Sequence, residues 1–181
     1  MSALDQFAVL LFEEAKRFLE KGSSERTATD KAAYFHASII MGFCSLEAHI
    51  NAIADDFLTR TDLSLHDKSV LSEKRVEFAE GRFKLSDNLQ IYRLEDRLLY
   101  LCERFSKRPL DRTTAYWGKF KAALALRNNL SHPKDPPVTI TQRSVESALK
   151  TILEILNVLY RKIYKRSNPI ARRGLHSPLT F

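Results

Sequence analysis

The chain has 181 residues, enough for one domain with a hydrophobic core of ordinary size. Its five glycines and six prolines are few, while Leu, Ala, Glu, Lys and Arg abound, a composition that favours helices. No uninterrupted apolar run approaches the length of a membrane span, and no basic-then-apolar leader opens the chain, so we expect a cytoplasmic protein without a membrane partner.

Apolar residues recur at helical spacing in five long segments, which we predict as helices over residues 3–21, 30–59, 89–106, 114–131 and 141–166. A short sixth helix is expected around 69–80, ending at Gly81, and the linker around Pro133, Pro136 and Pro137 should be stiff and extended. No stretch alternates convincingly with period two. The pattern predicts an all-α helical bundle, residues 1–166, followed by a basic, poorly ordered tail over 167–181.

The two cysteines, Cys44 and Cys102, each lie in a predicted helix beside apolar neighbours. This placement favours buried thiols in a reducing compartment over a disulfide. No Cys-x2-Cys or His-x3-His spacing occurs, so we expect neither a metal site nor a cofactor.

The net charge of +7 is unevenly distributed along the chain. Residues 107–181 carry 15 basic and 4 acidic side chains, whereas residues 1–106 carry 14 and 18. Such clustering is typical of proteins that bind a polyanion, most simply a nucleic acid. The alternative is a solvated basic face continued by a basic tail.

A short polar string, Arg127-Asn-Asn-Leu-Ser-His132, closes the predicted helix 114–131 and is followed at once by Pro133. Because a residue before proline avoids helical geometry, the helix should end at or just before His132, which lets its imidazole turn back toward Arg127. A guanidinium and an imidazole at one place suit an anionic substrate whose reaction needs proton transfer, such as a phosphodiester. The alternative is an ordinary helix C-terminus stabilised by basic side chains.

This string resembles the Arg-x4-6-His motif of the HEPN superfamily, in the form with a polar residue, here Asn128, after the arginine. The pair Arg60 and His66 has a similar spacing, but it lies in a predicted loop and lacks the asparagine. HEPN domains are helical bundles in which the motif precedes a long closing helix, as it does here. The resemblance in the order of helices therefore extends over residues 1–165, and the resemblance in specific residues is limited to the six of the motif.

Residues 42–51, Gly-Phe-Cys-Ser-Leu-Glu-Ala-His-Ile-Asn, also look like the second helix of many bacterial HEPN proteins, where a polar face looks toward the motif. Glu47 and Asn51 are one helical turn apart and share a face outside the apolar seam. Glu47 would then orient His132 or position Arg127. Alternatively, it caps a surface turn and has no further role.

The resemblance implies a metal-independent endoribonuclease, in which the 2′-hydroxyl of RNA attacks the adjacent phosphate and leaves 2′,3′-cyclic phosphate and 5′-hydroxyl ends. His132 would transfer a proton, Arg127 would stabilise charge on the phosphate, Asn128 would bind a phosphate oxygen or fix Arg127, and Lys134 would neutralise the adjoining phosphate. One imidazole does not readily serve both ends of an in-line displacement.

The resemblance also implies partners. Family members usually form homodimers that bring two motifs together. Many are toxins or effectors of toxin–antitoxin or abortive-infection phage-defence systems, neutralised by a protein antitoxin or a nucleotidyltransferase-type partner. Two alternatives remain open for this chain: a HEPN-like dimer that binds RNA or a nucleotide without cleavage, and a helical bundle that binds another protein.

Overall fold

The computed structural model describes residues 2–134 and 139–181, the side chains of residues 172 and 173 excepted. The elements in order are α1 (Ala3–Ser24), α2 (Ala28–Leu58), α3 (Leu65–Ser72), β1 (Lys74–Ala79), β2 (Arg82–Leu89), α4 (Leu94–Ser106), α5 (Ala115–Ser131), α6 (Gln142–Tyr164) and the 3-10 helix η1 (Pro169–Arg173). The predicted all-α class is confirmed, with one small antiparallel hairpin added to it. The expected stiff linker at Pro136 and Pro137 lies outside the described residues.

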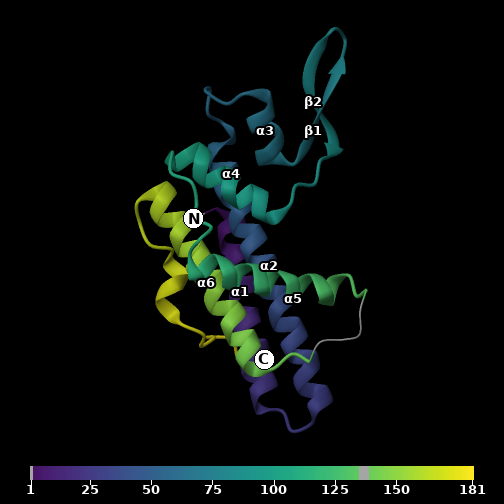
Figure 1. The fold of residues 1–181 in the computed structure, drawn as a ribbon, viewed down its shortest axis with the longest axis vertical. Helices are drawn as coiled ribbons and strands as arrows, with labels where there is room; N and C mark the ends of the chain where they lie inside the picture. Colours follow the sequence, from purple (N-terminus) through teal and green to yellow (C-terminus); the bar gives the residue numbers. More distant parts are fainter. Residues whose placement is uncertain (1, 135–138) are drawn as a thin grey trace.

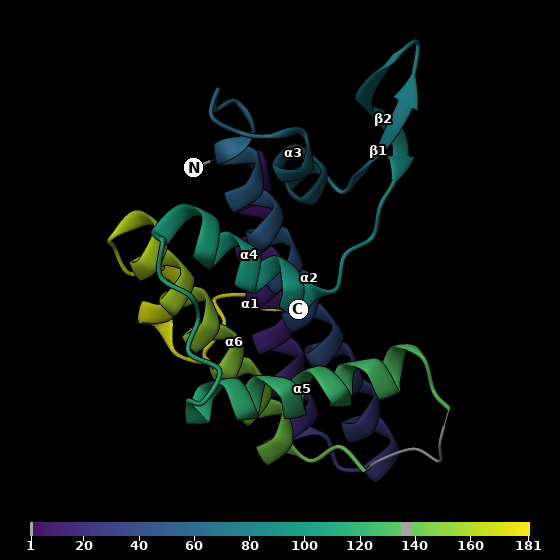
Figure 2. The ribbon, with the colours of Figure 1, turned by 45° about the horizontal axis from the view of Figure 1, so that its top comes forward.

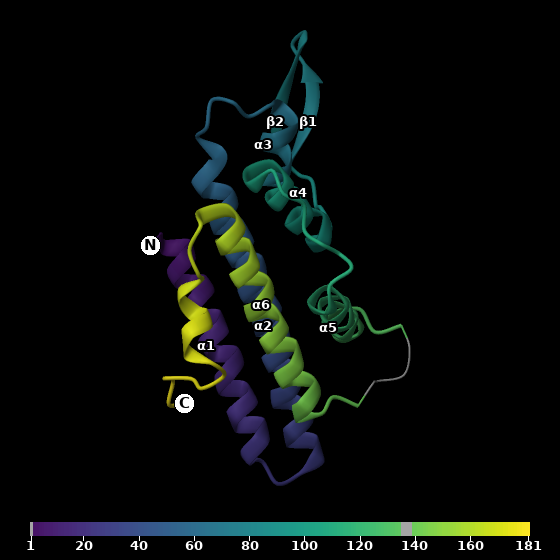
Figure 3. The same cartoon turned by 60° about the vertical axis from the view of Figure 1, so that its left-hand side comes forward.

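Helices α1, α2 and α6 run side by side along the long axis of the molecule, and α4 and α5 add further side chains to the core that they form (Figure 1; Figure 3). The predicted seams of α2 and α6 are buried between them, from Ile39 to Ile53 and from Val145 to Leu159. Gly42 lies on this seam, and a Cβ there would come within 2.6 Å of the Leu149 side chain. The missing side chain therefore lets α2 and α6 approach closely.

Helix α2 is long and apolar enough to cross a membrane by length and composition alone. In this fold 67% of its most apolar 18-residue window is buried against other helices. Burial of that kind is what the central helix of a helical bundle requires.

The predicted short sixth helix is present as α3, but its predicted bounds, 69–80, are wrong, because residues 74–89 form a β-hairpin. Helix α3 ends at Ser72, and the strands pair Val76 with Leu85 and Phe78 with Phe83. The two turn residues, Glu80 and Gly81, both have positive φ (55° and 76°), the geometry that tight hairpin turns use. The hairpin projects beyond the helices, and Phe78 and Phe83 are 66% and 68% exposed (Figure 1).

Two further helix boundaries differ from the prediction. Gly22 does not end α1; the helix continues to Ser24, and the absent Cβ makes room for the ring of Phe35. Helix α4 begins at Leu94 rather than near residue 89, which leaves Ile91 in the preceding connection and 81% exposed. Phe7, counted in the apolar pattern of the first helix, lies on the exposed face of α1.

The segment after α6, expected to be a poorly ordered tail, has specific contacts in this structure. Ile170 is part of the hydrophobic core, and the Ser177 hydroxyl donates to the Glu13 carbonyl oxygen of α1 at 2.8 Å. The ring of Phe181 packs edge-on against Phe18. The segment follows α1 because a few apolar side chains, spaced too irregularly to signal a helix, fit along its side (Figure 3).

Candidate functional site

Helix α5 carries the predicted motif at its C-terminal end. It is helical through Ser131, and His132 is its C-cap, with φ −140° and ψ 68°. The backbone N–H of His132 still donates to the Asn128 carbonyl oxygen at 2.8 Å. The expected end of the helix just before His132 is therefore confirmed, and it follows from the restriction that Pro133 places on the preceding residue.

Arg127 is held against α2 by Glu47. Its Nη2 donates to Glu47 Oε1 at 2.7 Å, and its Nη1 donates to the Asn128 side-chain oxygen at 3.2 Å. The Arg127 and Glu47 side chains are 27% and 38% exposed, so the pair lies at the surface with one edge open to solvent. Of the two roles considered for Glu47, the structure shows contact with Arg127, and this contact fixes where the guanidinium lies.

The second residue of the same α2 face, Asn51, contacts a different arginine. Arg97 of α4 donates from Nη1 to Asn51 Oδ1 at 2.8 Å and to Glu73 Oε2 at 2.9 Å. Glu47 and Asn51, one turn apart, thus each accept from an arginine on a separate helix that crosses α2 (Figure 2). Through these two contacts, the polar face of α2 fixes the positions of α4 and α5 relative to each other.

Arg97 is the residue that sequence reasoning missed. It is only 5% exposed, and burial lowers its pKa from the ordinary value, opposed by the nearby carboxylates of Glu73 and Glu47. A signal was available in the sequence, because Arg97 stands where the spacing of Leu94 and Leu101 predicts a buried position. A charge at such a position requires buried partners.

These groups surround a pocket of about 640 Å³ between α2, α4, α5 and the base of the hairpin. Its charged lining is balanced, with three carboxylates and three guanidiniums: Glu47, Glu73, Glu95, Arg93, Arg97 and Arg127. Leu89 and Ile91 supply an apolar wall that continues into the hairpin. An anion in this pocket would therefore be held by individual N–H donors rather than by a large net positive charge.

The predicted site residues divide into two groups. Arg127, Asn128, Glu47 and Asn51 all line the pocket. His132 and Lys134 are exposed beyond the end of α5 and do not line it. Among the described residues, no side-chain hydrogen bond or ion pair joins His132 to Arg127. Convergence of the imidazole and the guanidinium within one chain stays a prediction.

The similarly spaced pair, Arg60 and His66, has a different environment. Arg60 follows α2 and binds Asp62 through Nε and Nη2 at 2.8 and 2.9 Å. His66, expected in a loop, lies exposed in the first turn of α3. This pair provides a matched control for experiments on the motif.

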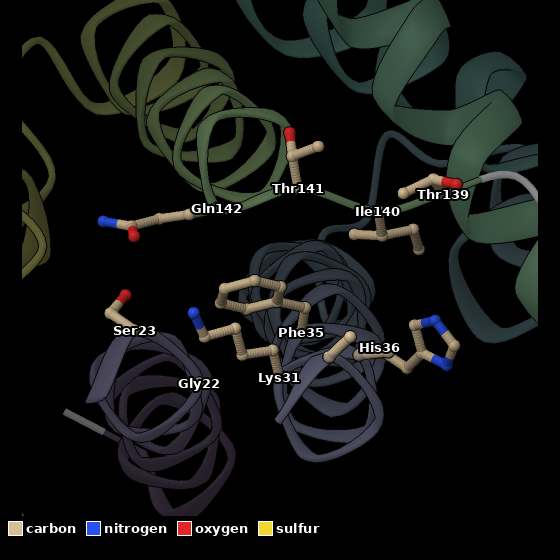
Figure 4. A pocket seen from close by; sticks show the side chains of 11 residues that line it. Gly22, Ser23, Lys31, Phe35, His36, Thr139, Ile140, Thr141 and Gln142 are labelled. Atoms are coloured by element: carbon tan, nitrogen blue, oxygen red, sulfur yellow. The ribbon is translucent and has the colours of Figure 1, made fainter. Parts of the chain in front are cut away.

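A second pocket, of about 510 Å³, lies at the other end of α2, between the end of α1 and the start of α6 (Figure 4). The side chains of Lys31 and Phe35 lie between the two helix ends, and His36 lies on the far side of Phe35 (Figure 4). None of the predicted site residues lines this pocket. Over residues 2–134 and 139–181, no group of three or more His, Cys, Asp or Glu side chains has the geometry to hold a metal ion.

No family model, no curated protein and no solved structure matches this chain. The resemblance to HEPN proteins stays a prediction from the motif residues and the order of the helices.

Proposed function

We propose that this protein is a metal-independent endoribonuclease whose reacting phosphate binds at Arg127. The observation that carries the proposal is the 2.7 Å ion pair between Glu47 and Arg127, placed at a pocket and five residues before an exposed histidine. Glu47 holds one edge of the guanidinium. The remaining N–H groups are then oriented for a phosphate before it arrives.

In this mechanism the 2′-hydroxyl attacks the adjacent phosphorus, and the P–O bond to the 5′ oxygen breaks. The 2′-hydroxyl proton leaves to a base, and the departing oxygen gains a proton. His132 supplies one of these proton transfers, because imidazole is the side chain suited to both roles near neutral pH. Arg127 stabilises the charge on the non-bridging oxygens, Asn128 fixes the guanidinium, and Lys134 binds the neighbouring phosphate.

A second imidazole is required at the opposite end of the displacement, and we propose that a second copy of the chain supplies it. The exposed position of His132, beyond the end of α5, suits a site shared between two copies. In the cell, the cytoplasmic dimer would act as a toxin-type effector on RNA and would be restrained by a protein partner.

The second candidate is an RNA- or nucleotide-binding module without cleavage. It is favoured by one observation, namely that His132 does not line the pocket that Arg127 lines. This candidate keeps Arg127 as an anion contact and gives His132 no chemical role.

The discriminating experiment incubates total cellular RNA in EDTA with wild-type protein, Arg127→Ala, His132→Ala and the control double variant Arg60→Ala/His66→Ala. We expect cleavage by the wild type and the control, and losses of roughly 10²–10³ in rate for each motif variant. Helicity by circular dichroism checks that each variant is folded.

Three other results would redirect the interpretation. Salt-sensitive RNA binding without products selects the second candidate. Full cleavage by His132→Ala contradicts the nuclease proposal. If the wild type neither binds nor cleaves RNA, a helical bundle that binds another protein is the better description.

A further inference from the structure

A third cavity, of about 360 Å³, lies where the start of α1 and the end of α6 meet α2 and η1. Its polar lining consists of Ser2, Asp5, His49, Asp56, Tyr160, Arg166 and Asn168. It shares no lining residue with the Arg127 pocket. Whatever this cavity does is therefore separate from the proposed nuclease site.

Two buried side chains in this cavity have polar atoms without a hydrogen-bond partner among the described residues. His49 is 2% exposed and both of its ring nitrogens lack a partner, and Asn168 is fully buried with its Nδ2 unpaired. Buried polar groups are nearly always paired, and leaving one unpaired costs about 1–3 kcal/mol. Three such atoms around one cavity indicate that it receives a polar molecule.

The His49 imidazole is neutral in this environment. Burial lowers its pKa to about 4, although the Asp5 carboxylate acts in the opposite direction. A neutral imidazole presents one donor and one acceptor, and the Asn168 amide nitrogen presents donors only. A ligand that satisfies them must itself carry both kinds of group.

Charges of both signs surround the same space. Asp5 Oδ2 accepts from Ser2 and Asp56 Oδ2 accepts from Tyr164, and the Oδ1 atom of each carboxylate has no such bond among the described residues. The Arg166 guanidinium lies over the Tyr164 ring at 5.5 Å. Asp5, Asp56 and Arg166 all line this one cavity, together with Tyr160. Burial and the two carboxylates raise the pKa of the Tyr160 phenol, and the guanidinium lowers it.

We propose that this cavity binds a small zwitterion with one protonated amine and one carboxylate, the chemistry of a free amino acid. The ammonium group is bound by the carboxylates of Asp5 and Asp56. The ligand carboxylate accepts from Arg166 and from the Asn168 amide. The neutral His49 imidazole accepts from the ammonium group with one ring nitrogen and donates to the carboxylate with the other, so the three unpaired atoms and both signs of charge are matched by one ligand.

The experiment titrates the common free L-amino acids, one at a time, into the full-length protein and follows the ring nitrogens of His49 by NMR. We expect at least one amino acid to bind saturably in a one-to-one ratio and to shift the His49 signals. Its carboxamide and its N-acetyl derivative, which each lack one charge, should bind roughly tenfold more weakly or worse. Asp56→Asn should weaken binding, whereas Asp62→Asn, an exposed carboxylate outside the cavity, should not.

A cavity that holds solvent only would give no saturable binding and unmoved His49 signals for every amino acid, which overturns the proposal. Equal affinity for the acid and its carboxamide overturns it as well, because the guanidinium and the amide would then have no role. Asp56→Asn removes the charge and keeps the shape of the side chain. The helicity of this variant, measured by circular dichroism, checks that a loss of binding does not come from a loss of folding. Neither result depends on whether RNA is cleaved at Arg127.

Discussion

In the α2–α6 core, apolar side chains recur every three or four residues and are buried on helices, whereas in the β1–β2 hairpin they alternate and are half-buried or exposed. The core seams extend over five or six turns, so their period is unmistakable. In the hairpin only Val76, Phe78, Phe83 and Leu85 alternate, and charged residues stand between them. Such short alternating runs are also compatible with a helix. The helical segments on either side therefore favoured a helix over 69–80.

The largest expected difference between the two regions is in the cost of removing an aromatic ring. Phe43→Ala should lower the free energy of unfolding by about 3–5 kcal/mol, because the Phe43 ring of α2 is fully buried and packs beside Phe120 of α5. Phe78→Ala should cost under about 1 kcal/mol, since only its cross-strand contact with Phe83 is lost. Urea unfolding of both variants measures the contrast, and equal losses would mean that the hairpin face is buried in solution.

His49 is a polar side chain buried in the helical bundle, and its burial should make the free energy of unfolding depend on pH. The folded pKa of about 4 lies below the ordinary 6.5, so the unfolded chain binds the proton first as pH falls. The free energy of unfolding should therefore decrease from near pH 6.5 down to near pH 4, by up to about 3 kcal/mol.

The His49→Phe variant should lack this part of the pH dependence, while His66→Ala, which removes an exposed histidine, should retain it. Thermal unfolding at several pH values provides the measurement. Identical pH profiles for wild type and His49→Phe would show that the imidazole is not buried as described.

The two arginines that meet the polar face of α2 offer a smaller contrast. Arg97→Met should cost about 2–3 kcal/mol, because it leaves Asn51 and the partly buried Glu73 carboxylate without their partner. Arg127→Met should cost under about 1 kcal/mol, since its ion pair with Glu47 is open to solvent. Chemical denaturation of both variants tests whether Arg97 is structural and Arg127 is free for binding, and the reverse order would exchange these roles.

The smallest expected effects come from two glycine substitutions that should change the free energy of unfolding in opposite directions. Gly81→Ala should destabilise the protein by about 1 kcal/mol, because φ of 76° is unfavourable for a residue with a side chain. Gly118→Ala should stabilise it by about 0.5–1 kcal/mol, because the position is helical and nothing lies within 4 Å of the added methyl group. If both substitutions stabilise, the Glu80–Gly81 turn is not formed as described.

Elements with a long repeating pattern or a strong local signal could be predicted from the sequence, and elements that depend on distant contacts could not. The helix end at Ser131 could be predicted because Pro133 acts locally, and the α2 and α6 seams because they repeat many times. The place of Glu47 could only be offered as one of two alternatives, since its partner is 80 residues away. The burial of Arg97 follows from its place in the apolar spacing of its helix, but its partners and the cavity at His49 depend on which helices pack together, information that no single segment contains.

The central claim is that Arg127 and His132 act on a phosphate next to a 2′-hydroxyl. Its most direct test compares two oligonucleotides of one sequence, an RNA and its fully 2′-deoxy counterpart, incubated in EDTA with wild-type protein and with Arg127→Ala. The account predicts 2′,3′-cyclic phosphate and 5′-hydroxyl ends from the RNA with wild type alone. Equal cleavage of the deoxy strand, or undiminished cleavage of the RNA by Arg127→Ala, would contradict it.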